Sequence, residues 1–123
     1  MIIASVRIEF FRNPESELTL HLKGHIKERK VVMVGMVLAE ILQGIRTKKE
    51  ANRVKESLKR LPYLEVTWDA WEKAGELSRD LRRRGITIPL SDLLIASLAI
   101  VEGYEVLTVD PHFQPVSGLK LNA

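Results

Sequence analysis

Three carboxylates stand out in this chain because each lies within or beside an apolar segment. Glu40 is the only charge in a helix-like segment, Asp92 lies near the start of a long apolar stretch, and Asp110 follows a strand-like run. Taken singly, they are explained by an exposed helix face, a helix N-terminus and an Asx turn. Taken together, they are hard oxygen ligands that repel one another unless a divalent cation lies between them. Such a cation can activate water and stabilise charge on a phosphate.

The apolar stretch 90–101 is the element that must position Asp92. Its only polar residues are Ser91, Asp92 and Ser97, so a helix here is apolar almost all round and belongs in the protein interior. Pro89 suits the start of this helix, where Ser91 is an alternative cap, and Gly103 suits its end. Asp92 is therefore expected in the first turn, at the rim of a buried element.

Short strand-like runs alternate with helix-like segments along the rest of the chain. Strands are expected at 1–4, 31–34, 64–67 and 105–109, with an edge strand in 118–123; helices are expected at 6–11, 16–30, 35–45, 48–61 and 68–84. In the helix at 68–84, Trp71, Ala74, Leu77 and Leu81 are expected to face inward. This alternation predicts one α/β domain over 1–123 with a mainly parallel central sheet. Sites in such folds lie at the carboxyl ends of the strands. We therefore expect Asp110 and residues 3–5 there, with Glu40 and Asp92 on helices beginning nearby.

Composition narrows the classes of function. The 123 residues include no cysteine, which excludes disulfides and thiol chemistry and suits a reducing cytoplasm. No apolar run reaches membrane-spanning length, and the N-terminus lacks the pattern of a signal peptide. The net charge of +3 mildly favours an anionic partner such as RNA. Arg82 to Arg84 and the lysines of 48–60 are candidates for phosphate contacts, although a solvated surface is the default interpretation of these residues.

Four segments resemble, in order, the motifs of the PIN-domain family, and more narrowly those of the VapC-type ribonuclease toxins of prokaryotic toxin–antitoxin pairs. They are Ser5-Val-Arg-Ile-Glu-Phe-Phe, Leu38-Ala-Glu-Ile-Leu-Gln-Gly, Leu90-Ser-Asp-Leu-Leu-Ile-Ala and Leu107-Thr-Val-Asp-Pro-His-Phe. The resemblance implies a three-layer α/β/α fold and cleavage of RNA with Mg²⁺ or Mn²⁺. It also implies that Glu40, Asp92 and Asp110 are the catalytic metal ligands, that an antitoxin protein fills the acidic groove, and that the chain forms a homodimer.

The first motif departs from the family pattern. The family has an aspartate at the end of the first strand, whereas Ile3-Ala4-Ser5 stands here, one residue short and without a carboxylate. Glu9 is no substitute, because it lies a helical turn beyond Ser5. Ser5 itself either assists the metal site or caps the following helix. An aspartate inserted between Ile3 and Ala4 is expected to restore the ligand.

Several interpretations remain open at this point. The leading function is a metal-dependent endoribonuclease; the alternatives are a catalytically inactive homologue that still binds RNA or an antitoxin and, with a poorer fit, a phosphate-transfer receiver domain. His112 either touches substrate or is an exposed turn residue. His21 and His25 have the i, i+4 spacing of helical zinc ligands but no third ligand nearby in the sequence. The two tryptophans and the Phe10-Phe11 pair add apolar surface suited to self-association.

Overall fold

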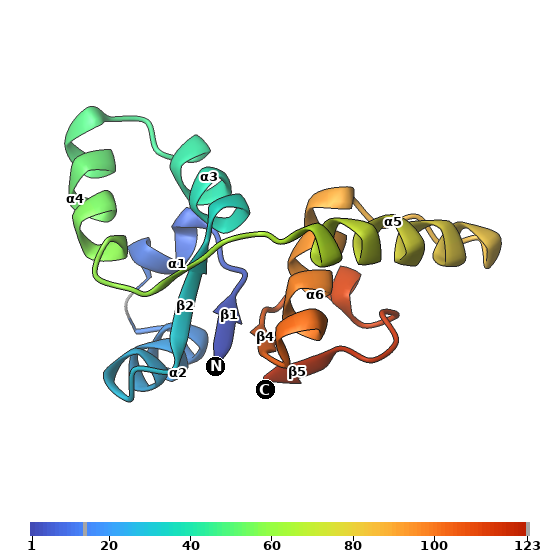
Figure 1. Ribbon diagram of the computed structural model, residues 1–123. Helices are drawn as coiled ribbons and strands as arrows, with labels where there is room; N and C mark the ends of the chain where they lie inside the picture. Colours follow the sequence, from blue (N-terminus) through green and yellow to red (C-terminus); the bar gives the residue numbers. More distant parts are fainter. Residues whose placement is uncertain (14, 123) are drawn as a thin grey trace.

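The computed structural model describes residues 1–13 and 15–122, without the side chains of residues 9 and 11. Along the chain these residues form β1 (Ile2–Ala4), α1 (Ile8–Arg12), α2 (Glu17–Lys27), β2 (Val31–Val34), α3 (Gly35–Gln43), α4 (Lys48–Leu58), β3 (Tyr63–Leu64), α5 (Trp68–Arg83), α6 (Leu90–Glu102), β4 (Glu105–Leu107), the 3-10 turn η1 (Pro111–Phe113) and β5 (Lys120–Asn122). The expected alternation of strands and helices is therefore confirmed (Figure 1).

The five strands form one parallel sheet in the order β3-β2-β1-β4-β5. β1 lies in the middle, with Ile3 paired to Val32 on β2 and to Val106 on β4. The chain adds β2 and β3 on one side of β1 and then returns to add β4 on the other. The boundary between β1 and β4 is thus the switch point of the sheet, where parallel α/β folds bind their ligands.

The helices cover both faces of the sheet because the crossovers run in opposite directions. Right-handed connections place the helices between β1 and β3 on one face and those between β3 and β4 on the other. Figure 1 shows α5 and α6 together, on the opposite side of the molecule from α3 and α4. The α/β fold with a mainly parallel central sheet is confirmed.

Helix α6 is the buried element that its sequence predicts. Residues 92–99 are all buried, and Leu93 and Ala99 have no exposed surface. The one buried hydroxyl in this run, on Ser97, donates to the Leu93 carbonyl oxygen at 2.6 Å. The helix ends at Gly103, whose φ of 73° is left-handed and is tolerated by glycine without a Cβ clash.

The N-terminal helix differs from its prediction. α1 begins at Ile8, not Val6, and Arg7 occupies the N-cap position without a capping side chain. Ser5 therefore does not cap this helix. The next helices follow expectation, because the Ser16 and Thr47 hydroxyls accept from the backbone N–H groups of Thr19 and Glu50.

Helix α5 buries most of the face expected, because Ala74 and Leu81 are buried as predicted. Trp71 was predicted to point inward but is 53% exposed, and the buried residue near it is Ala70. α5 packs mainly against α6. Small side chains at this contact let the two helices approach closely, so the large ring of Trp71 lies outside it.

The other deviations are shifts of element ends. β3 spans only two residues, consistent with its place at the sheet edge. None of the helices described in residues 1–13 and 15–122 is both long and apolar enough to cross a membrane.

Candidate active site

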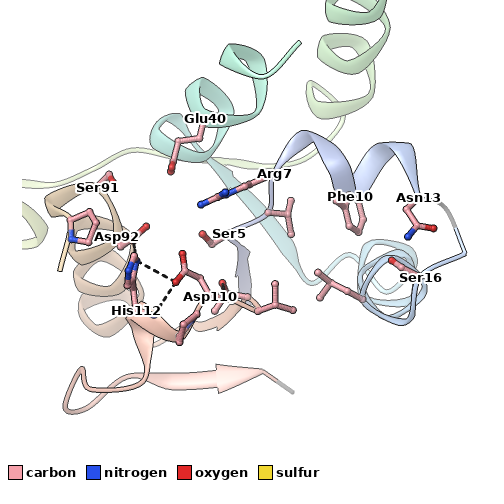
Figure 2. A pocket seen from close by; sticks show the side chains of 16 residues that line it. Ser5, Arg7, Phe10, Asn13, Ser16, Glu40, Ser91, Asp92, Asp110 and His112 are labelled. Carbon is pink, nitrogen blue, oxygen red and sulfur yellow. Dashed lines mark hydrogen bonds and ion pairs between the residues drawn. The ribbon is translucent and has the colours of Figure 1, made fainter. Parts of the chain in front are cut away.

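A cavity of about 860 Å³ opens at the carboxyl ends of β1 and β4. Its polar and charged lining residues are Ser5, Arg7, Asn13, Ser16, Glu40, Ser91, Asp92, Thr108, Asp110 and His112. The three carboxylates singled out in the sequence therefore share one cavity, although they come from α3, α6 and the turn after β4 (Figure 2). The switch point of the sheet is what brings them together.

Asp92 and Asp110 are joined by His112. The His112 Nδ1 atom lies 2.9 Å from Asp92 Oδ2 and 3.2 Å from Asp110 Oδ1. Ionised carboxylate oxygens only accept hydrogen bonds, so Nδ1 must carry the imidazole proton. One atom from each of these three side chains lies within 4.8 Å of the other two. The arrangement places a single N–H between two negative charges.

The turn after β4 fixes the position of Asp110. Its backbone N–H donates to Thr108 Oγ1 at 3.0 Å, and its carboxylate accepts from the backbone N–H of His112 at 2.9 Å. This is the Asx-type turn that Asp110-Pro111 favours. The structural and the chemical interpretation of Asp110 are thus compatible, because the turn holds the carboxylate at the cavity wall.

Asp92 is almost fully buried, unlike a typical surface carboxylate. It is only 9% exposed, in the first turn of α6. The N-terminus of a helix favours a negative charge through its dipole and free N–H groups. The dipole of α6 therefore favours a negative charge at this position, where the His112 Nδ1 atom also approaches Asp92 Oδ2.

The Glu40 carboxyl interacts electrostatically with Asp92 and Asp110 across the cavity. Burial raises the pKa of the Glu40 carboxyl, and the negative charges of Asp92 and Asp110 raise it further, while Arg7 lowers it. The structure therefore places the Glu40 charge within electrostatic reach of the pair. Like-charge repulsion of this kind is what a bound cation relieves.

Arg7 is a positively charged residue of the cavity, and the sequence did not indicate that it belongs to the site. Its side chain extends into the cavity from the loop between β1 and α1, with its guanidinium group between Glu40 and Ser5 in the view of Figure 2. It offsets part of the acidic charge. A guanidinium group is also well suited to bind a phosphate oxygen.

Ser5 is the first residue along the chain that lines the cavity. Ile3 and Ala4 are buried within β1, whereas Ser5 follows the strand and lines the cavity wall. Its backbone N–H donates to the Leu107 carbonyl oxygen at 2.9 Å, which holds the end of β1 against β4. The wall thus carries a hydroxyl at the end of β1.

His112 is the residue whose role was least apparent from the sequence. Its distance of twenty positions from Asp92 gave no sign that the two side chains meet. The available signal was its place directly after the last acidic motif. Within the described residues, it completes the one cluster of three or more His, Asp or Glu side chains with metal-ligand spacing.

Comparison with known proteins assigns the family. The PIN domain family model matches residues 4–119, which is almost the whole chain. The chain belongs to the PIN domain family. The PIN match runs from the end of β1 to the start of β5 and so includes every residue of the acidic cavity.

Individual relatives agree with this assignment. This PIN domain is 35% identical over 86 residues to a protein named ribonuclease VapC2 from Rickettsia felis, covering 67% of the chain and 64% of the relative. It thus spans less than two thirds of that relative's length. Among solved structures, VapBC2 of Rickettsia felis bound to a promoter DNA fragment has a TM-score of 0.78 and 27% identity, with 99% and 98% of the two chains covered.

A more distant structure supports the fold alone. DNA-bound VapBC from Salmonella typhimurium has a TM-score of 0.79 at 19% identity, with 98% of this chain and 96% of that chain covered. The sequence-based prediction of a PIN-like α/β domain is therefore confirmed by the family match and by the shared architecture.

The donors in this PIN domain suit a hard divalent cation. Asp92, Asp110 and Glu40 offer carboxylate oxygens, which Mg²⁺ and Mn²⁺ prefer. Two oxygens on one Mg²⁺ lie at most about 4.2 Å apart, since each metal–oxygen bond is about 2.1 Å. The Asp92 and Asp110 atoms lie within 4.8 Å of each other, whereas Glu40 is not part of this cluster.

Proposed function

We propose that this PIN domain is a VapC-like endoribonuclease that cleaves RNA phosphodiester bonds with the help of Mg²⁺ or Mn²⁺. The observation that carries the proposal is the convergence of Glu40, Asp92 and Asp110 in one cavity at the switch point of the sheet. The family and a relative named as a ribonuclease support it. The three carboxylates are the proposed catalytic residues and metal ligands, and Ser5 is the proposed auxiliary residue.

The cation supplies Lewis-acid stabilisation of the charge that develops on the scissile phosphate. The protein's own side chains bind and orient the RNA. Arg7 binds a non-bridging phosphate oxygen and orients the RNA backbone across the cavity. His112, fixed by its Nδ1 contacts with Asp92 and Asp110, presents its Nε2 atom as a hydrogen-bonding group toward the substrate. The basic side chains of α4 and the end of α5 attract the RNA backbone.

The wider setting is also a proposal. VapBC proteins, such as the similar VapBC2 of Rickettsia felis, are described as a family of toxin–antitoxin systems, and we propose that a cognate antitoxin protein neutralises this chain by covering the acidic cavity. We also propose that the protein forms a homodimer and that it is located in the cytoplasm. The absence of cysteine is consistent with a reducing compartment.

A second candidate is a catalytically inactive PIN domain that binds RNA or an antitoxin. The observation that favours it is Ser5, which provides a hydroxyl at the end of β1 in place of the family's carboxylate. With one acidic ligand fewer, the site holds a cation more weakly. Binding without cleavage would then be the remaining activity.

The two functions are separated by an RNA cleavage assay with purified protein and Mn²⁺, Mg²⁺ or EDTA. The endoribonuclease predicts metal-dependent fragments that disappear in Asp92→Asn. The matched control is Asp80→Asn, which removes an exposed carboxylate on α5, outside the cavity. Equal background cleavage by the wild type and Asp92→Asn, together with retained RNA or antitoxin binding, would support the inactive candidate instead.

A further inference from the structure

A second group of ligating side chains lies outside the acidic cavity. His21 and His25, one turn apart on α2, meet Asn122 at the carboxyl end of β5. The His21 Nε2 atom lies 2.8 Å from Asn122 Oδ1, and the His25 Nε2 atom lies 3.1 Å from the same oxygen. The two Nε2 atoms are 3.2 Å apart. None of these three residues lines the acidic cavity.

The orientation of the Asn122 amide is fixed by its other contact. Its Nδ2 atom donates to Glu105 Oε1 at 3.0 Å. A carboxylate oxygen only accepts, so the amide nitrogen must face Glu105 and the amide oxygen must face the two imidazoles. Glu105 thereby holds a lone-pair-bearing oxygen against the histidine pair.

No placement of the imidazole protons satisfies all three contacts among His21, His25 and Asn122 as hydrogen bonds. If one imidazole donates to the other, the accepting nitrogen also faces the Asn122 oxygen, and two acceptors meet. If both imidazoles donate to Asn122, two N–H groups face each other at 3.2 Å. The hydrogen-bonding contacts of His25 run through its Nε2 atom. A cation resolves the conflict, because all three atoms can then present lone pairs to it.

The distances also suit a first-row transition metal. Two ligands bound about 2.0–2.1 Å from a tetrahedral zinc ion lie about 3.3–3.4 Å apart. The three separations of 2.8, 3.1 and 3.2 Å are close to that value or slightly shorter. Two imidazoles favour zinc, cobalt, nickel or copper over magnesium. We propose that His21, His25 and Asn122 form a binding site for Zn²⁺ or a similar transition-metal ion, separate from the acidic cavity.

The site connects parts of the chain that are far apart in sequence. Asn122 lies 101 positions from His21 and 97 from His25. A metal ion held here ties α2 to the edge strand β5 and binds the folded chain but not the unfolded one. Binding of that kind raises the midpoint of thermal unfolding, Tm.

The test is a Zn²⁺ titration of the full chain without a histidine tag, in an Asp92→Asn/Asp110→Asn background that disables the acidic cavity. Calorimetry should give one site, and excess Zn²⁺ at about a hundredfold over Kd should raise Tm by about 5–10 °C. His21→Gln and His25→Gln should each weaken Zn²⁺ binding at least tenfold and remove the Tm shift. His112→Gln, which changes the one other histidine, should leave both unchanged.

A gain-of-affinity variant makes the test independent of any damage done by the histidine changes. Asn122→Asp, made together with Glu105→Gln so that two carboxylates do not face each other, replaces a weak amide ligand by a carboxylate and should tighten Zn²⁺ binding at least tenfold, whereas Asn122→Ala should weaken it. Circular dichroism confirms that each variant is folded. The proposal is overturned if the wild-type affinity stays within threefold in His21→Gln and His25→Gln, or if the chain binds no Zn²⁺ at millimolar concentration.

Discussion

At the residue scale, the proposed metal site depends on what the end of β1 contributes to the acidic cavity. Ser5 reaches the cavity from this strand, while Ile2, Ile3 and Ala4 pair within the sheet. An insertion between Ile3 and Ala4 would have to be absorbed by strand residues that pair with their neighbours. Substitution at Ser5 adds a carboxylate without that disturbance.

We predict that Ser5→Asp raises the affinity for Mn²⁺ at least about tenfold, or roughly 1.4 kcal/mol. The reason is an additional hard oxygen ligand beside Asp110 and Asp92. RNA cleavage should increase in parallel and be lost when Asp92→Asn is added. Ser5→Asn is the matched control, with the same shape and no charge. Equal Mn²⁺ affinities for the two Ser5 variants, measured by calorimetry, would contradict the three-carboxylate site.

Arg7 should act in the opposite direction on metal binding. Removing its charge in Arg7→Ala should tighten Mn²⁺ binding by roughly threefold at low salt, because a screened repulsion of less than about 1 kcal/mol is lost. RNA affinity should fall at the same time. Arg7→Lys keeps the charge and should retain the weaker Mn²⁺ binding. Titrations at pH 8 in low and high salt check this, since the difference should shrink as salt screens the charges.

Glu40 provides a pH-dependent signature in the metal-free protein. Its pKa is raised in the folded state by burial and by Asp92 and Asp110, so the folded chain binds this proton more tightly than the unfolded chain does. Its ionisation therefore destabilises the fold at neutral pH, and that effect disappears as the pH falls through the raised pKa toward 4.5. Glu40→Gln should raise Tm by a few degrees at pH 7.5 in EDTA.

The same comparison at pH 4.5 is the internal control. There a larger share of the wild-type carboxyl is protonated than at pH 7.5, so the Tm difference between the wild type and Glu40→Gln should be smaller. A Tm difference that is equal at both pH values would mean that Glu40 does not carry the electrostatic penalty.

At the element scale, α6 joins the core to the cavity. Its buried run begins with Asp92 at the cavity wall and continues through the interior to Ala99. Any loosening of this helix should therefore be transmitted to the carboxylate. Because the first turn carries both the acidic group and the start of the packed face, stability and site geometry are coupled in one element.

Leu93→Ala tests how much the packing of α6 contributes to the stability of the fold. Leu93 is 0% exposed, and truncating a buried leucine typically costs about 2–5 kcal/mol of unfolding free energy. Leu90→Ala on the same helix is the matched control, since Leu90 is 58% exposed and should cost under about 1 kcal/mol. Urea unfolding measures both. Similar losses for the two variants would show that α6 is not the packed centre of the fold.

At the scale of the whole molecule, α5 offers an apolar surface for self-association. Trp68 and Trp71 lie three positions apart on one helix face and are 78% and 53% exposed. Phe10 is partly buried against the core, and the Phe11 side chain lies outside the described residues, so the tryptophans carry this prediction.

We predict a homodimer of twice 14.0 kDa in light scattering at micromolar concentration. Trp68→Ser/Trp71→Ser should shift it toward the monomer, because exposed aromatic side chains are frequent anchors of interfaces. Leu20→Ser, at another exposed apolar residue on α2, should leave the mass unchanged. A wild-type monomer would contradict the homodimer.

The sequence by itself determined the order of strands and helices, the burial of α6 and the meeting of Asp92 with Asp110. These follow from local rules: apolar periodicity defines the elements, and parallel strands end at one edge. The glycine that ends α6 was predictable for the same local reason. The family resemblance added the expected roles of Glu40, Asp92 and Asp110.

Only the tertiary structure decided which side chains from distant segments touch. The contact of His112 with Asp92, the entry of Arg7 into the cavity and the meeting of Asn122 with the α2 histidines leave no periodic signal, because they depend on distances between separately packed elements. Trp71 was misplaced for a related reason: the face that α5 buries is set by its close packing on α6, not by hydrophobicity alone.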